Sequence, residues 1–168
     1  MIFETDRLIV RELDSASDAE FICALLNTPK FIKYIGDRGV RTPDEAAAFI
    51  ESRYRQSYRE HGYGLYAVEL NDSRTKIGMC GFVRRDSLPG PDIGFAFLPE
   101  FERKGYGYES ASAMMKYGRE TLSFTAVWAI TSLDNAASGK LLENLGFEFA
   151  KLIESGDEML KLYSFGPV

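Results

Sequence analysis

The sequence has few of the residues on which metal sites, disulfide frameworks and membrane spans depend. It contains one histidine and two cysteines in 168 residues, and none of its apolar runs approaches the 18 residues of a transmembrane helix. Cys23 and Cys80 lie 57 positions apart in apolar stretches, which is typical of free thiols in a reducing compartment. His61 has no neighbouring histidine or cysteine, and residues 1–7 lack the features of a signal peptide. We therefore expect a cytoplasmic protein that needs no metal.

The charge of the chain disfavours nucleic acid as its main ligand. The sequence has 20 Lys and Arg residues against 25 Asp and Glu residues, a net charge of −5. Its basic residues are scattered and form no stripe of the kind that contacts a phosphate backbone. A cationic or amine-bearing partner fits this balance better. With 45% hydrophobic residues and no linker, the chain is expected to form one domain, residues 1–168.

The first third of the chain predicts one strand followed by helices. Residues 8–13 have the pattern of a short strand, and Ser17 to Glu20 resembles a capping box at the start of a helix. Two further helices are expected to start at Thr28-Pro29 and at Thr42-Pro43, because each pair places a capping residue before a proline.

The rest of the chain alternates between strand and helix patterns. Aromatic and β-branched residues at 63–70, 76–84 and 92–98 predict an antiparallel meander. A helix at 108–122 and a strand at 126–132 then predict a parallel crossover. A helix at 136–145, closed by Gly146, precedes a hairpin of residues 147–153 and 159–165. The expected class is α+β with a mixed, mostly antiparallel sheet.

The segment from Leu98 to Glu109 carries the clearest chemical signal. It joins a strand to a helix and contains Gly105, Gly107 and two cations, Arg103 and Lys104. Free backbone amides at a helix N-terminus bind anions, and glycine lets a phosphate come close to them. The alternative is an ordinary turn with solvated cations. The segment matches neither the dinucleotide fingerprint nor a Gly-Lys-Ser/Thr phosphate loop.

A second segment, Ile130 to Ser138, ends a buried strand and opens the last helix. Taken alone, it predicts a plain helix cap by Asp134 or Asn135.

The two segments together resemble a GNAT-type N-acetyltransferase, particularly the branch of ribosomal-protein N-terminal acetyltransferases (RimJ/RimL-like). The resemblance extends over essentially the whole chain. It rests on five elements in the family's order: Thr5–Arg11, Asp92–Glu100, Lys104–Gly107, Asn135–Ser138 and Leu145–Phe147. It implies a three-layer α/β/α fold with a V-shaped splay between strands 92–98 and 126–132.

The resemblance also implies that acetyl-CoA is the co-substrate and lies in this splay. Its pyrophosphate would contact the loop, and its pantetheine would run along the first strand. Asn135 would reach the pantetheine arm, and Ser138 would lie nearby at the adenine end. The implied cofactor-binding residues are Phe95, Ala96, Phe97, Leu98, Arg103, Lys104, Gly105, Tyr106, Gly107, Tyr108, Asn135 and Ser138. Two positions depart from the family pattern. Glu102 replaces a Gln or Arg, and Leu142 replaces a tyrosine that acts as general acid.

Direct acetyl transfer to an amine requires a neutral amine and a polarised carbonyl, but no nucleophilic side chain. Asp92, Glu69 and Ser132 are the candidate bases, since each is expected near a strand end. The alternative for each is a solvated or backbone-bonded side chain. Cys80 has no basic neighbour and is interpreted as a core residue.

We therefore expect an acetyl-CoA-dependent N-acetyltransferase that acetylates a protein N-terminus or a small-molecule amine in a ternary complex. Two rival hypotheses remain open. One is a catalytically weak acyl-CoA sensor, motivated by Glu102 and Leu142, and the other is a module that binds a different phosphorylated ligand. No nucleic-acid or membrane partner is expected, and the chain could act as a monomer or, by pairing edge strands, as a homodimer.

Overall fold

A computed structural model describes residues 1–167 of the chain, and its strands form a continuous sheet. The order across the sheet is β1-β2-β3-β4-β5-β6-β8-β7. Each neighbouring pair is antiparallel except β5 and β6. The strands are β1 (Phe3–Glu4), β2 (Leu8–Arg11), β3 (Leu65–Leu70), β4 (Lys76–Arg84), β5 (Pro91–Phe97), β6 (Val127–Ser132), β7 (Glu148–Ser155) and β8 (Glu158–Phe165).

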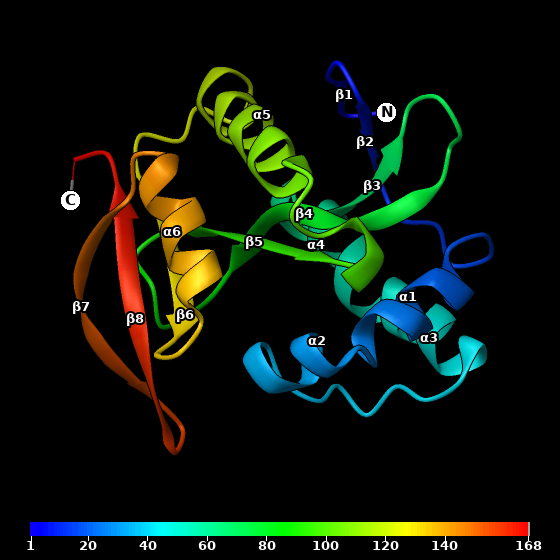
Figure 1. Ribbon diagram of the computed structural model, residues 1–168, viewed down its shortest axis with the longest axis horizontal. Helices are drawn as coiled ribbons and strands as arrows, with labels where there is room; N and C mark the ends of the chain where they lie inside the picture. The colour runs from blue at the N-terminus through cyan, green and yellow to red at the C-terminus, as the bar shows by residue number, and fades with distance from the viewer. Residues whose placement is uncertain (168) are drawn as a thin grey trace.

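Helices cover both faces of this sheet (Figure 1). α5 and α6 lie on one face, and the N-terminal helices lie on the other. The helical segments are α1 (Ala19–Leu26), α2 (Pro29–Tyr34), α3 (Pro43–Phe49), the π-helical η1 (Ile50–Arg55), α4 (Gln56–His61), the 3₁₀ turn η2 (Pro99–Phe101), α5 (Tyr106–Glu120) and α6 (Ala136–Asn144). The arrangement confirms the predicted mixed, mostly antiparallel α+β fold.

The alternation of side chains along the central strands builds two separate cores. Tyr66 and Val68 of β3 pack in the core beneath α5 and α6, whereas Ala67 between them packs in the core beneath α1 and α3. In β4, Cys80 packs in the core beneath α5 and α6, and its neighbour Met79 packs in the core beneath α1 and α3. A strand that is buried on both faces has to be apolar at successive positions, and this is why these strands read as nearly continuous hydrophobic runs.

β5 and β6 separate almost as soon as they meet. Their ladder has one pair of partners, Asp92 and Trp128, after which the strands diverge. The predicted V-shaped splay is therefore confirmed. The splay widens toward the C-terminal end of β5, which leads to η2 and α5.

Two of the three predicted helix starts are confirmed. The hydroxyls of Thr28 and Thr42 accept hydrogen bonds from the backbone amides of Phe31 and Glu45, and Glu45 completes a capping box. The predicted capping box at Ser17 is wrong. α1 starts after Asp18, but the Asp18 side chain does not cap it, because this carboxylate is fully buried and bonded elsewhere.

Asp18 belongs to a buried ion-pair network that joins α1 to β2, β3 and β4. Arg11 contacts Asp18 at 2.8 Å and Glu69 at 2.5 Å. Lys76 contacts Asp18 at 2.9 Å, and Arg74 contacts Glu69 at 2.8 Å. Burial by itself would raise the pKa of Asp18, but hydrogen bonds, chiefly from Arg11, lower it to about 2. Arg11 therefore holds the buried Asp18 carboxylate in its charged form and also pairs with the buried Glu69.

We expect Arg11→Met to lower the free energy of unfolding by about 3–5 kcal/mol, because it leaves buried carboxylates without their main partner. Urea titrations at neutral pH measure this loss. The contribution of Asp18 is complete above its unfolded pKa of 3.8 and is lost as the pH falls toward about 2. A change below about 1 kcal/mol at pH 7 would contradict the assignment.

Among residues 1–167, no helix is both long and apolar enough to cross a membrane.

Candidate functional site

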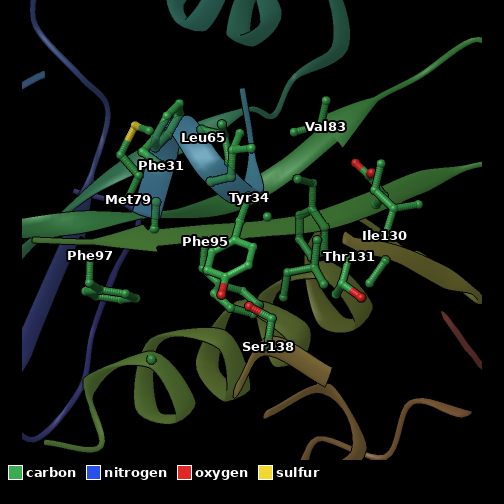
Figure 2. Close-up of a pocket in the computed structure, with 18 of the residues that line it drawn as sticks. Phe31, Tyr34, Leu65, Met79, Val83, Phe95, Phe97, Ile130, Thr131 and Ser138 are labelled. Atoms are coloured by element: carbon green, nitrogen blue, oxygen red, sulfur yellow. The ribbon is translucent and has the colours of Figure 1, made fainter. Parts of the chain in front are cut away.

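The splay between β5 and β6 opens into a cleft of about 1160 Å³. Its lining comes from α2, η1, β4, β5, β6, the η2–α5 loop and the start of α6. Figure 2 shows Tyr34 and Ser138 entering the cleft beside Phe95, from three different elements. Pockets for one small ligand usually measure about 300–1000 Å³. The cleft is therefore larger than a usual pocket for one small ligand.

The glycine loop at one end of the cleft has free backbone donors. Gly105 precedes α5 with φ of 83°, and Arg103 has φ of 59°. Within residues 1–167, the backbone N–H groups of residues 103–108 donate to no protein acceptor. These donors sit at the N-terminus of the 15-residue helix α5, whose dipole favours negative charge. The loop is therefore suited to an anion such as a phosphate.

Most of the residues expected to bind the cofactor line this cleft. Nine of the twelve do so: Phe95, Ala96, Phe97, Arg103, Gly105, Gly107, Tyr108, Asn135 and Ser138. Leu98, Lys104 and Tyr106 are not among the lining residues. The Asn135 side chain caps α6 by accepting a hydrogen bond from the Ser138 amide at 3.3 Å.

Asp92 is a buried carboxylate at the narrow end of the splay. Its residue is 2% exposed, lines the cleft and contacts Arg85 at 2.7 Å through Oδ2. Within residues 1–167, Oδ1 has no hydrogen-bond partner. Burial raises the pKa of Asp92 to about 6, although Arg85 opposes the shift. A carboxyl with this pKa and a free oxygen can accept a proton near neutral pH.

The other two candidate bases are occupied elsewhere. Glu69 is paired with Arg11 and Arg74 in the buried network and does not line the cleft. Ser132 does not line it either, since its hydroxyl donates to the carbonyl oxygen of Tyr34 at 3.1 Å. The structure thus brings Asp92 alone of the three to the cleft.

The sequence profile of the GNAT acetyltransferase domain matches residues 7–148. The chain belongs to the GNAT family. An N-acetyltransferase of Bacillus subtilis, YoaA, described as uncharacterized, is 30% identical over 148 residues, which is 88% of this chain and 82% of YoaA. As a member of this family, the protein is an N-acetyltransferase.

Solved structures share the GNAT fold. RimL, a ribosomal-protein acetyltransferase solved with coenzyme A, has a TM-score of 0.83 and is 15% identical, over 98% of this chain and 96% of RimL. The spermidine N-acetyltransferase of Vibrio cholerae, solved with CoA and spermine, has a TM-score of 0.77 and is 18% identical, over 96% of both chains. At these identities the likeness concerns the fold alone.

In this GNAT protein, Arg7 fastens the glycine loop to the N-terminal strands. Its Nη1 donates to the Lys104 carbonyl at 3.0 Å, and its guanidinium lies 4.5 Å from the centre of the Tyr106 ring. Glu109 of α5 contacts Arg7 at 2.6 Å and accepts from the Thr5 hydroxyl at 2.7 Å. The role of Arg7 is not visible in the sequence motif Thr5–Arg11, because its partners lie about 100 positions away.

In the same enzyme, α2 spans the mouth of the cleft. On one side Lys30 forms an ion pair with Glu102 of the loop. On the other side Lys33 contacts Asp134 at 3.5 Å, beside the bond from Ser132 to Tyr34. Glu102, which departs from the family pattern, has its charge compensated by Lys30. Leu142 is buried and adds an apolar wall.

Cys80 does not line the cleft, whereas His61 lies at its wall. Cys80 is buried, and burial raises the pKa of its thiol to about 12. His61 is the last residue of α4, which closes on Gly62 with φ of 77°. The burial of Cys80 confirms its interpretation as a core residue.

Proposed function

We propose that the protein transfers acetyl directly from acetyl-CoA to a primary amine while both are bound in the cleft. The observation that carries this proposal is the layout of the cleft: free backbone donors at one end and a buried carboxylate with a free oxygen at the other. RimL and the spermidine acetyltransferase, which share the fold, were both solved with CoA.

Each part of acetyl-CoA has a chemically suitable place. The pyrophosphate suits the amides of residues 103–108 together with the guanidinium of Arg103, because these groups offer hydrogen bonds and positive charge. The pantetheine suits the open edge of β5 at residues 95–98, where β6 has turned away. Asn135 and Ser138 line the cleft at the start of α6, where Asn135 would reach the pantetheine arm and Ser138 the adenine end.

In the chemical step the amine nitrogen attacks the thioester carbonyl, and the C–S bond breaks. The surplus amine proton moves to Asp92, whose raised pKa still leaves it ionised at pH 7. An α-amine has a pKa near 7.7–8.0, so its neutral form costs about 3.5 kcal/mol less than that of a lysine. No phenol stands at position 142, and CoA leaves as a thiolate that takes its proton from solvent.

Calorimetric titration with acetyl-CoA, CoA and ATP, followed by a turnover assay with amines, tests the proposal. We expect micromolar or tighter binding of acetyl-CoA and release of free CoA when an amine is added. Binding without turnover for any amine would instead support the acyl-CoA sensor. Binding of ATP but not of acetyl-CoA would support a module for another phosphorylated ligand.

Replacing Arg7 tests whether the loop needs its anchor. We expect Arg7→Met to weaken acetyl-CoA binding about tenfold, because the loop loses a charged hydrogen bond and a stacking contact that fix its amides. Calorimetry measures the change in Kd. Arg119→Met is the control, since Arg119 lies near the other end of α5 and pairs with its neighbour Glu120. Equal Kd values in both variants would show that the loop holds its shape without Arg7.

A further inference from the structure

Arginines without a carboxylate partner gather in the cleft. The sequence has twelve arginines. Within residues 1–167, eight of them contact a carboxylate: Arg7, Arg11, Arg41, Arg55, Arg59, Arg74, Arg85 and Arg119. The remaining four, Arg38, Arg53, Arg84 and Arg103, all line the cleft. The cleft thus holds positive charge that the described part of the chain does not neutralise.

Three of these arginines belong to elements other than the glycine loop. Arg84 ends β4 beside Pro91, at the opposite end of β5 from the loop. The seven residues of β5 separate the two ends by about 20 Å. Arg38 follows α2, and Arg53 belongs to η1. Arg103 can therefore serve the phosphates of acetyl-CoA, which leaves Arg38, Arg53 and Arg84 in the cleft for another ligand.

Tyr54 adds a buried polar group to this part of the cleft. The residue is 8% exposed and lines the cleft, and its hydroxyl has no hydrogen-bond partner within residues 1–167. Burial raises the pKa of the phenol, and the charges of Arg38 and Arg53 act in the opposite direction. Arg38, Arg53 and Tyr54 all line the cleft, and Arg53 and Tyr54 both pack against the Phe49 ring.

The backbone of η1 holds two of these groups in place. Arg53 and Tyr54 both lie in its single π-helical turn. Such turns are rare in proteins overall, but those that occur are often at functional sites. The Phe49 ring supports both, because it packs edge-on against Tyr54 at 5.4 Å and lies 5.9 Å from the Arg53 guanidinium.

The acidic residues of the cleft do not cancel this charge. Asp92 pairs with Arg85, Glu102 with Lys30, and Asp134 with Lys33. Glu60 accepts a hydrogen bond from Gln56 and lies 4.0 Å from His61. Arg38, Arg53 and Arg84 thus remain available to a ligand.

We propose that the acceptor is an amine that carries an anionic group, such as a carboxylate, which binds to Arg38, Arg53 and the Tyr54 hydroxyl. This inference rests on the proposed function and adds the class of acceptor. It departs from the cationic partner that the net charge suggests. Polyamines fit poorly, because three unpaired guanidinium groups repel them.

Acceptor competition gives the first test. The probes are two peptides that share an N-terminal alanine, one with glutamates at the next two positions and one with alanines, together with free glutamate and spermine. We expect kcat/KM for the acidic peptide to exceed that for the neutral peptide at least tenfold, with spermine the poorest acceptor. Free glutamate tells whether a small acid suffices or a peptide is needed. Equal values for the two peptides would overturn the inference.

Paired variants give the second test. We expect R38Q/R53Q to reduce the acidic-to-neutral ratio of kcat/KM at least tenfold, and Tyr54→Phe to reduce it several-fold. The controls are Arg41→Gln and Arg59→Gln, which remove nearby arginines that pair with Asp37 and Glu51 outside the cleft. An unchanged ratio in R38Q/R53Q would overturn the inference. Turnover without acidic preference defeats this inference alone, whereas no turnover with any amine defeats the proposed function as well.

Discussion

Asp92→Asn should reduce kcat/KM for acetyl transfer by about 10²–10⁴-fold while the protein still binds acetyl-CoA. The amide keeps the size of the carboxyl but cannot accept the amine proton. The free Oδ1 and the burial of the residue make Asp92 the group in the cleft that is best suited to that task. Stopped assays of CoA release measure the rate, and calorimetry measures the binding.

The pH profile separates this role from a merely structural one. The pKa of Asp92 is raised to about 6, so its carboxyl is protonated and inactive below that pH. In the wild type, kcat/KM should therefore fall as the pH decreases through about 6. A second decrease, the amine limb, occurs at higher pH because the acceptor amine becomes protonated. Asp92→Asn should lose the limb near 6 and keep the amine limb.

Asp86→Asn is the matched control. It makes the same chemical change in a nearby exposed residue that does not line the cleft, and we expect it to keep the rate and both limbs. A variant of Asp92 with an unchanged rate would remove this carboxylate from the mechanism.

Gly105→Val should weaken acetyl-CoA binding more than 100-fold. A side chain at this position would block approach to the amides of residues 103–108, and its Cβ would lie 3.2 Å from Arg7. Losing two hydrogen bonds to a charged phosphate costs about 3–6 kcal/mol. Calorimetry with acetyl-CoA measures the change.

Backbone strain must be separated from the loss of binding, because Gly105 has φ of 83°. Gly156 in the β7–β8 turn also has positive φ, 60°, and open space around it. Gly156→Val therefore carries a comparable strain far from the cleft, and we expect it to lower the melting temperature without changing the Kd for acetyl-CoA. Similar Kd values for Gly105→Val and the wild type would place the phosphates elsewhere.

Local patterns were enough to predict most of the fold. The strands 76–84 and 92–98, the crossover through α5 and the caps at Thr28 and Thr42 all depend on neighbours in the sequence, and the structure has them. The glycine loop was recognisable for the same reason, since two glycines and two cations lie within five residues of the chain.

Features that depend on distant partners could not be predicted from the sequence. Ser17 and Glu20 look like a capping box, but Asp18 is drawn into the core by Arg11 and by Lys76, which is 58 positions away. The π-helical turn at Ile50–Arg55 has the spacing of an ordinary helix in the sequence. Whether an arginine is paired depends on tertiary contacts, so the unpaired group in the cleft could not be distinguished from the other arginines.

The single pair that joins β5 to β6 has a consequence for local opening of the structure. Where the strands diverge, backbone groups of β5 and β6 face the cleft instead of each other. Amide protons there exchange with solvent more readily than those in the complete ladders on either side, such as β4 with β5 and β6 with β8. A ligand lying in the V takes the place of the missing strand contacts, so deuterium uptake along residues 93–98 should slow when it binds. Deuterium uptake in this part of β5 therefore shows whether a ligand occupies the cleft, even in a variant without catalytic activity.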